Sequence, residues 1–142
     1  MIAAARAFRW PAVLAWLALI FWLSHQSVLP DVGPGDTDLL FKKAGHVVVY
    51  AVLAMLFVWA LHRPPGPPPR RVLLLAFALT VLYAISDEIH QTFVPGRGGH
   101  AIDVALDATA AALGLWLASQ LTRRRGSGPI RPVAGRADCY GG

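Results

Sequence analysis

Residues 47–61 read VVVYAVLAMLFVWAL, a run of fifteen positions without a charged side chain. A helix that is apolar on every face is either buried in a large protein or embedded in lipid. Similar runs lie at 11–23, 72–85 and 108–118, and a chain of 142 residues is too small to bury four such helices within itself. The sequence therefore predicts an all-α protein with four transmembrane helices, at about 7–27, 39–62, 72–91 and 101–121.

The overall composition supports a membrane protein. Hydrophobic residues make up 56% of the chain and charged residues 15%, against roughly 45–50% and about 25% in soluble domains. A soluble four-helix bundle is the alternative, but the polar outer faces that it needs are missing. The first apolar run also fits a signal peptide, although residues 24–27 lack a small-x-small cleavage site and three more runs follow.

The basic residues predict an orientation in the membrane. Ten arginines flank one side of an up-down-up-down bundle, whereas Lys42, Lys43 and Arg97 flank the other. Because the more basic side is usually cytoplasmic, we expect both termini inside the cell. The net charge of +5 then reflects anchoring to the lipid bilayer, and no nucleic-acid partner is expected. We expect a four-span membrane domain at 1–121 and a disordered basic cytoplasmic tail at 122–142.

Polar side chains gather at the helix ends that this topology places on the outer side. Helical spacing groups them into stripes, which are Lys43, His46 and Tyr50; Tyr83, Asp87, His90 and Gln91; and His100, Asp103 and Asp107, followed by Ala111 and Gly114. Small residues let helices approach closely in lipid, so the third stripe is expected to face the bundle and to carry its carboxylates inward. Ionisable residues at such depth usually mark a functional site.

Several segments resemble the VanZ-like family, small integral membrane proteins named after a teicoplanin-resistance factor. The resemblance covers residues 16–118 and rests on Ser24-x-Gln-Ser27, Lys42-Lys-Ala-Gly-His46-x3-Tyr50, Ser86-Asp-Glu-Ile-His-Gln-Thr-Phe-Val-Pro-Gly-Arg97, Asp103-Val-x2-Asp107 and Gly114. It implies a multi-pass protein of the bacterial cytoplasmic membrane with a role in the cell envelope. The sequence departs from the family at Lys42, where many members carry an acidic residue.

The first functional hypothesis is recognition of an anionic ligand in an outward-facing polar pocket. Arg97 follows a Pro-Gly pair that favours a tight turn, and arginine pairs with phosphate or carboxylate through two hydrogen bonds. A lipid-linked envelope precursor or a lipoglycopeptide is the expected ligand, with an effect on teicoplanin susceptibility. The expected binding residues are Arg97, Lys43, His46, Tyr50, Gln91, Asp103 and Asp107. The competing interpretation is that Arg97 pairs internally with Asp87 or Asp103.

The second hypothesis is acid–base catalysis by a membrane-embedded hydrolase or transferase. Asp87, Glu88 and His90 are the candidate catalytic residues, because hydrolysis needs a positioned acid and base. A buried hydrogen-bond network that joins the third helix to the fourth is the competing interpretation. A metal site built from His46, His90 and His100 is a third possibility, but no local metal-binding motif is present. The sequence therefore predicts no metal ion and no cofactor.

Overall fold

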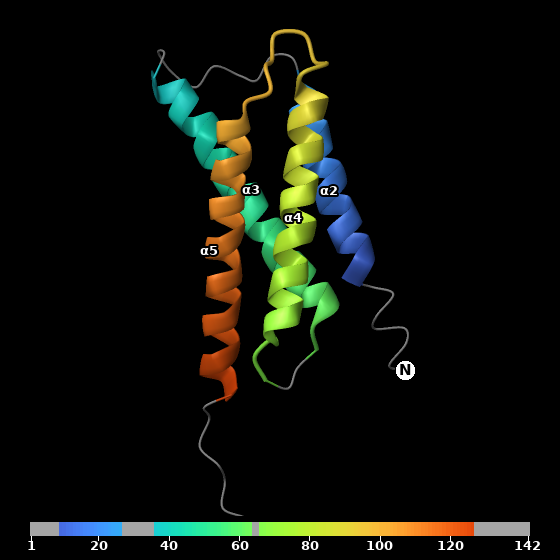
Figure 1. Cartoon of the computed structure of the whole chain (residues 1–142), viewed down its shortest axis with the longest axis vertical. Helices are drawn as coiled ribbons and strands as arrows, with labels where there is room; N and C mark the ends of the chain where they lie inside the picture. The colour runs from blue at the N-terminus through green and yellow to red at the C-terminus, as the bar shows by residue number, and fades with distance from the viewer. Residues whose placement is uncertain (1–8, 27–35, 64–65, 127–142) are drawn as a thin grey trace, which may run out of the picture.

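Four helices make up most of the structure, a computed structural model that describes residues 9–26, 36–63 and 66–126, with only the backbone for 36–42 and 124–126. They are α2 (Arg9–Ser24), α3 (Asp36–Leu61), α4 (Arg70–Gln91) and α5 (Ala101–Gly126) (Figure 1). The described residues contain no strand, so the predicted all-α bundle is confirmed. The side chain of Lys42 lies outside the described part of the structure. So does the predicted tail from residue 124 onward, apart from the backbone of 124–126.

Three of the helices are long and apolar enough to cross a bilayer. Within the described residues these spans are Lys43–Leu61, Arg70–Gln91 and Ala101–Arg123. The 16 residues of α2 are also apolar, but they extend only about 24 Å at 1.5 Å per residue, against a hydrocarbon core of roughly 30 Å. The chain is therefore a membrane protein. Three of its predicted spans are supported by length among the described residues, whereas the first predicted span, at 7–27, corresponds to the shorter helix α2.

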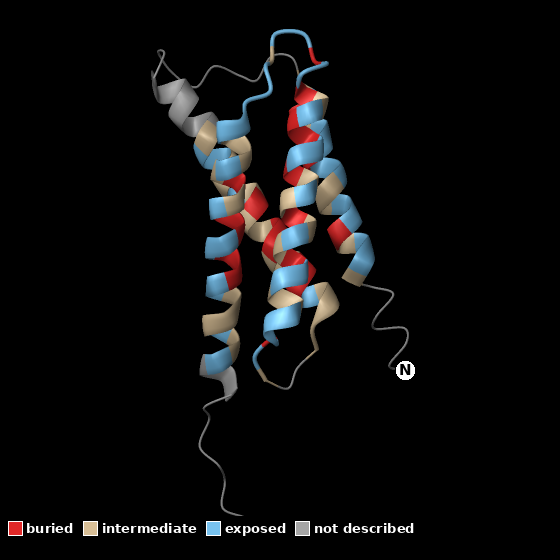
Figure 2. Ribbon diagram, in the orientation of Figure 1, coloured by how far each residue is buried: buried red, intermediate tan, exposed pale blue. Residues whose placement is uncertain are grey.

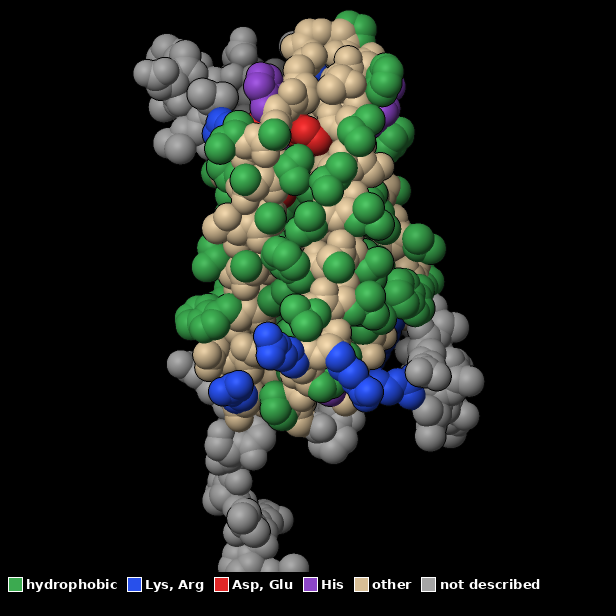
Figure 3. Space-filling model, in the orientation of Figure 1, with side chains coloured by type: hydrophobic (Ala, Val, Ile, Leu, Met, Phe, Trp, Pro, Cys, Tyr) green, Lys and Arg blue, Asp and Glu red, His purple; other side chains and the backbone are tan. Residues whose placement is uncertain are grey.

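The outer surface of the bundle has the character of a surface that faces lipid. Large apolar side chains are exposed on all four helices, among them Leu14, Val48, Leu82 and Trp116, and exposed positions cover the outside of the bundle (Figure 2). In the view of Figure 3 hydrophobic side chains occupy the middle of the molecule. Lysine and arginine gather at the lower end in that view, and acidic and histidine side chains lie near the upper end. Soluble monomers rarely expose so much contiguous apolar surface.

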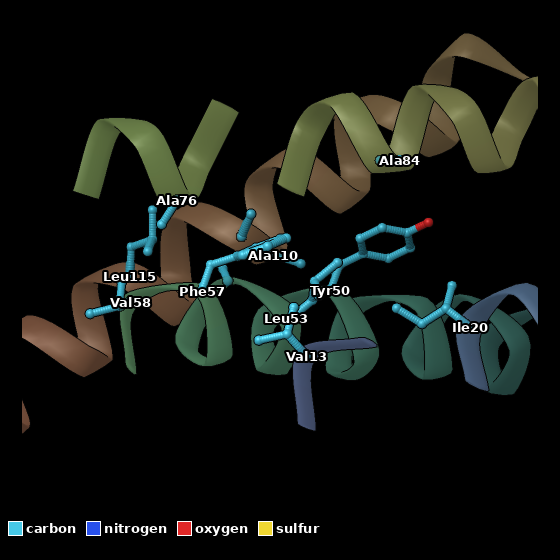
Figure 4. Close-up of a cluster of buried hydrophobic side chains, with 12 residues drawn as sticks. Val13, Ile20, Tyr50, Leu53, Phe57, Val58, Ala76, Ala84, Ala110 and Leu115 are labelled. Atoms are coloured by element: carbon cyan, nitrogen blue, oxygen red, sulfur yellow. The ribbon is translucent and has the colours of Figure 1, made fainter. Parts of the chain in front are cut away.

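The core lies around α3, which packs against each of the other helices. Tyr50, Leu53 and Phe57 of α3 are buried among small side chains of α4 and α5, including Ala84 and Ala110 (Figure 4). α5 approaches α3 closely at Gly114, where an added Cβ would overlap the carbonyl oxygen of Ala51 on α3. Small residues at such crossings let the backbones come together, as the sequence stripe ending at Gly114 predicts.

Arg9 fastens the beginning of α2 to the end of α3. Its Nη1 donates to the carbonyl oxygens of Trp59, at 2.6 Å, and His62, at 3.0 Å. Its guanidinium also lies 5.1 Å from the centroid of the Trp59 ring. The last carbonyls of a helix lack partners within the helix and carry partial negative charge. Arg9 therefore satisfies the end of α3, a role that counting arginines for topology does not reveal.

Candidate functional site

The polar ends of the helices meet at one end of the bundle. The last residue of α2 contacts the end of α4, and the first turns of the membrane-spanning part of α3 contact the beginning of α5. The polar stripes that the sequence places on separate helices are thus assembled into two clusters. One is buried among α2, α3 and α4, and the other lies between α3 and α5.

Asp87 is the centre of the buried cluster. Its Oδ2 accepts hydrogen bonds from Ser24 Oγ at 2.8 Å, from Tyr50 OH at 3.0 Å and from Gln91 Nε2 at 3.1 Å. These donors come from α2, α3 and α4, and only 4% of Asp87 is exposed. Its Oδ1 is buried as well and has no hydrogen-bond partner among the described residues. Asp87 therefore holds three helices together with one oxygen, in a network that sequence inspection had placed between α4 and α5.

Two carboxylates of α5 face two basic side chains of α3. Lys43 Nζ lies 2.7 Å from Asp103 Oδ1, and this ion pair is partly exposed. One helical turn deeper, His46 Nδ1 lies 3.6 Å from Asp107 Oδ1, and both atoms are buried without a hydrogen bond. The spacing of three and four residues on each helix brings the pairs into register. The third stripe thus carries its carboxylates inward as its small residues predict.

A tight turn between α4 and α5 positions Arg97. The Arg97 N–H donates to the Val94 carbonyl oxygen at 3.1 Å. Pro95 and Gly96 lie between them, and Gly96 has a φ of 80°. This is a type II turn, in which the third residue needs a positive φ that glycine adopts without strain. The turn directs the Arg97 side chain back to the end of α2, where Nη1 donates to the Ser24 carbonyl oxygen at 3.0 Å.

Glu88 connects α4 to the beginning of α5. Its Oε1 accepts the backbone N–H of His100, the residue that precedes α5. A carboxylate is favourable there because the first N–H groups of a helix lack internal partners. The connecting loop passes so near to α4 that a Cβ at Gly99 would lie 2.7 Å from the Glu88 carbonyl oxygen. Glu88 is therefore buried beneath the loop and acts as a cap for α5.

A pocket of about 380 Å³ opens beside these residues. Ten residues from α3, α4, α5 and the α4–α5 loop line it: Lys43, His46, Gln91, Arg97, Gly98, His100, Ile102, Asp103, Leu106 and Asp107. The family profile described as VanZ/LLP1 matches residues 8–123, which include all of them. The chain belongs to the VanZ/LLP1 family. The resemblance identified from the sequence motifs is thereby confirmed. No curated protein and no solved structure matches the chain.

The predicted site residues of this VanZ/LLP1 protein do not all lie in the pocket. Six of the seven predicted binding residues line it, and the seventh, Tyr50, is buried beside His46, with the two ring centroids 6.1 Å apart. Of the predicted catalytic residues, Asp87 and Glu88 are buried outside the pocket lining. His90 lies against the end of α2. Its Nε2 is 3.3 Å from Nδ1 of His25, which follows α2, and its ring is tilted against that of Phe21, with the centroids 4.6 Å apart.

Three contributors to the site escaped the list of candidate residues. Ser24 donates to Asp87, and Ile102 and Leu106 form an apolar part of the pocket wall. Ser24 stands in the first motif of the family resemblance, which was the available signal. Ile102 and Leu106 are spaced four residues apart beside Asp103 and Asp107, so they share a helix face. In an apolar membrane helix such residues have no distinguishing pattern.

Proposed function

We propose that this VanZ/LLP1 protein binds the anionic group of a lipid-linked envelope precursor or a lipoglycopeptide in its polar pocket, and thereby affects teicoplanin susceptibility. The proposal rests on the position of Arg97 in the pocket and on its lack of a carboxylate partner among the described residues. Its side chain lines the pocket, and the described residues contain no ion pair of Arg97 with any carboxylate. Asp103 is paired with Lys43 instead, and Asp87 accepts three uncharged donors. The lack of a carboxylate partner for Arg97 among the described residues supports ligand binding over an internal ion pair with Asp87 or Asp103.

The chemistry of the pocket favours a ligand with an acidic head and an apolar body. A guanidinium has five N–H donors in a planar fork that fits phosphate or carboxylate. The carbonyl oxygen of Ser24 uses only one Arg97 nitrogen, so other donors of the fork remain for a ligand. Lys43 supplies further positive charge at the rim, while Ile102 and Leu106 supply apolar surface. Lipid-linked phosphates and lipoglycopeptides combine both features.

The distribution of charge supports an outward-facing pocket in the bacterial cytoplasmic membrane. Arg9, Arg63, Arg70, Arg71 and Arg123 lie at the ends of the helices opposite to the pocket. Figure 3 shows the resulting gathering of basic side chains at that end of the molecule. Because basic residues accumulate on the cytoplasmic side of membrane proteins, the pocket would face the outer leaflet. Envelope precursors and antibiotics are accessible from that side.

Arg97→Ala is expected to weaken binding of the anionic ligand by at least about tenfold. A charge-assisted hydrogen bond contributes about 1.5–3 kcal/mol, and about 1.4 kcal/mol corresponds to a factor of ten in affinity. Binding is measured by thermophoresis on the purified protein in nanodiscs, with teicoplanin in one arm and a polyprenyl phosphate in the other. The two arms distinguish the two sources of the anion.

Arg71→Ala is the matched control for that experiment. It removes the same charge from the exposed beginning of α4, at the opposite end of the bundle. The Arg71→Ala variant should bind teicoplanin or the polyprenyl phosphate with the same affinity as the unaltered protein. Equal affinities of the Arg97→Ala variant and the unaltered protein would refute the proposal, as would the absence of binding in both arms.

A second candidate function, acid–base catalysis on the bound ligand, is favoured by the pair formed by His46 and Asp107. The Asp107 carboxylate is 1% exposed and its Oδ1 faces His46 Nδ1 at 3.6 Å. A buried carboxylate beside one ring nitrogen is the arrangement that orients a catalytic imidazole. The other ring nitrogen would take the proton of a water whose oxygen attacks the terminal phosphorus of a lipid diphosphate, and the leaving oxygen of the lipid monophosphate would receive that proton as the phosphoanhydride bond breaks.

In this second function, Asp107→Asn is expected to lower the rate of hydrolysis by about 100-fold or more, as general acid–base groups contribute about 10²–10⁴. Release of inorganic phosphate from a polyprenyl diphosphate gives the rate, and binding of the same lipid serves as the control because the substitution preserves shape. Phosphate release at equal rates from both proteins would eliminate this function, and so would a complete lack of turnover by the unaltered protein.

A further inference from the structure

We infer that Glu88, His100 and Asp103 form a binding site for a divalent transition-metal ion at the edge of the pocket. Each of the three offers one ligand atom, and these atoms all lie within 4.8 Å of one another. They come from the end of α4, from the loop and from the first turn of α5. Only His100 belongs to the three histidines that the sequence suggested as a metal site. Glu88 and His100 are far apart in the sequence, which explains why no local motif indicates these three ligands.

A hydrogen bond of the His100 ring uses Nδ1 and leaves Nε2 available for a metal ion. His100 Nδ1 lies 2.9 Å from the carbonyl oxygen of Gly98. A carbonyl oxygen can only accept, so Nδ1 must carry the proton, and the neutral ring then presents the lone pair of Nε2. Histidines that bind metals usually donate their other ring N–H to a backbone carbonyl or a carboxylate in this way. The hydrogen bond to Gly98 thus leaves the Nε2 lone pair of His100 available before any ion binds.

The two carboxylates are fixed in the same manner. Glu88 Oε1 accepts the backbone N–H of His100, and Asp103 Oδ1 accepts Lys43 Nζ at 2.7 Å. Each carboxylate has a second oxygen with lone pairs for a metal ion. Glu88 is 7% exposed, so its geometry is determined by the surrounding protein. All three ligands are therefore held by supporting hydrogen bonds, which raise the affinity of metal sites.

An independent observation, the balance of charge at this end, also points to a cation. The described residues place four carboxylates here, those of Asp87, Glu88, Asp103 and Asp107, against the cations of Lys43 and Arg97. Carboxylates thus outnumber the lysine and arginine side chains among the described residues at this end. Asp107 also lines this pocket, and its Oδ1 is buried without a hydrogen bond, 3.6 Å from His46 Nδ1. Buried charge of this kind is costly unless it is paired or bound to a metal.

The ligand set determines the class of ion. Imidazole with two carboxylates suits zinc or manganese, whereas magnesium and calcium prefer oxygen ligands alone. Tetrahedral zinc with bonds of about 2.0–2.1 Å places its ligand atoms about 3.3 Å apart. The ligand atoms would therefore have to move together by on the order of 1 Å to bind zinc. The exposed side chain of His100 has room for this movement. Three protein ligands leave a fourth position open, and there an anion oxygen could bind if the proposed function holds.

The test uses the full-length protein, purified without a histidine tag and stripped with chelator. Cobalt(II), a spectroscopic substitute for zinc, is titrated alone, and bound metal is measured by elemental analysis after gel filtration. We expect one ion per chain and visible absorption bands of cobalt with nitrogen and oxygen ligands. His100→Ala should weaken binding by about tenfold or more, since even supporting residues of metal sites contribute about 10–100-fold.

Glu88→Gln provides a second, nearly isosteric variant, and the same loss is expected there. His90→Ala is the matched control, because it removes a histidine at the same end of the bundle whose ring lies against α2. Gel filtration and circular dichroism report whether each variant is folded. Absence of stoichiometric metal on the unaltered protein would overturn the inference. So would binding that survives both ligand substitutions or that disappears in the His90→Ala control. The titration contains no anionic ligand, so its result is separate from that of the Arg97 experiment.

Discussion

Replacing Gly114 with leucine should prevent α5 from packing against α3 and abolish accumulation of the folded protein. Even the first atom of a side chain at this position would overlap the Ala51 carbonyl oxygen and lie 3.0 Å from the Ala51 Cα. Those neighbours are backbone atoms, so no side-chain rotation relieves the contact. Between membrane helices close packing replaces the hydrophobic effect as the main source of affinity. Gly114→Ala should therefore cost about 1–3 kcal/mol, and the leucine more.

Gly45→Ala is the matched control for the substitutions at Gly114. Gly45 lies in α3, and a Cβ built there meets nothing within 4 Å. Alanine is favoured over glycine in a helix by about 1 kcal/mol, so this change should be neutral or stabilising. Unfolding of the purified proteins in mixed detergent micelles with increasing dodecyl sulfate gives the free energies. Equal stability of the Gly114→Ala and Gly45→Ala proteins would show that the helices do not cross closely at this point.

Asp87→Ala should produce the second large loss of stability, about 3–5 kcal/mol. The substitution removes the common acceptor of Ser24, Tyr50 and Gln91, and it leaves the buried hydroxyl donors of Ser24 and Tyr50 without their acceptor. An unsatisfied buried donor costs about 1–3 kcal/mol. Asp87→Asn keeps one oxygen in place and should lie between the alanine variant and the unaltered protein. The same dodecyl sulfate titration measures both.

Asp103→Ala, studied in metal-free buffer, is the control for the loss of a carboxylate. Its pair with Lys43 is partly exposed, with 38% of the lysine side chain and 29% of the aspartate side chain accessible. Exposed ion pairs contribute about 0–1 kcal/mol, so this variant should remain close to the unaltered protein. If the two alanine variants proved equally stable, the network around Asp87 would have no role in holding the helices.

The helices and turns were predictable because their causes are local. Lipid selects uninterrupted apolar runs, so the bounds of α4 and α5 follow closely from the composition. Proline is accepted in the first turn of a helix but not in its interior, and Pro69 accordingly precedes the first residue of α4 in an extended conformation. The Pro-Gly pair before Arg97 forms the expected tight turn. α2 is the exception, because it ends at Ser24, before the polar residues His25 and Gln26 that the predicted 7–27 span included.

The composition of the pocket was only partly predictable, because it depends on which helix lies beside which. An α-helix turns by about 100° per residue. Viewed along α4, the side chain of His90 therefore lies about 60° to one side of Asp87, and that of Gln91 lies about 40° to the other side. Helical spacing places all three on one face. The neighbouring helices then separate them, since α2 takes His90 towards His25, whereas Gln91 reaches both Asp87 and the pocket. No pattern within α4 contains that information.

The two arginines that fasten α2 have a consequence for biosynthesis. Arg9 lies 50 residues before its acceptor on Trp59, so its bonds can form as soon as the ribosome has delivered the first helical hairpin. Arg97 lies 73 residues after its acceptor on Ser24. The opposite end of α2 must therefore wait for most of the chain to be translated. We therefore expect nascent molecules to close from the basic end first, and the end of the bundle that holds the acidic groups to close last.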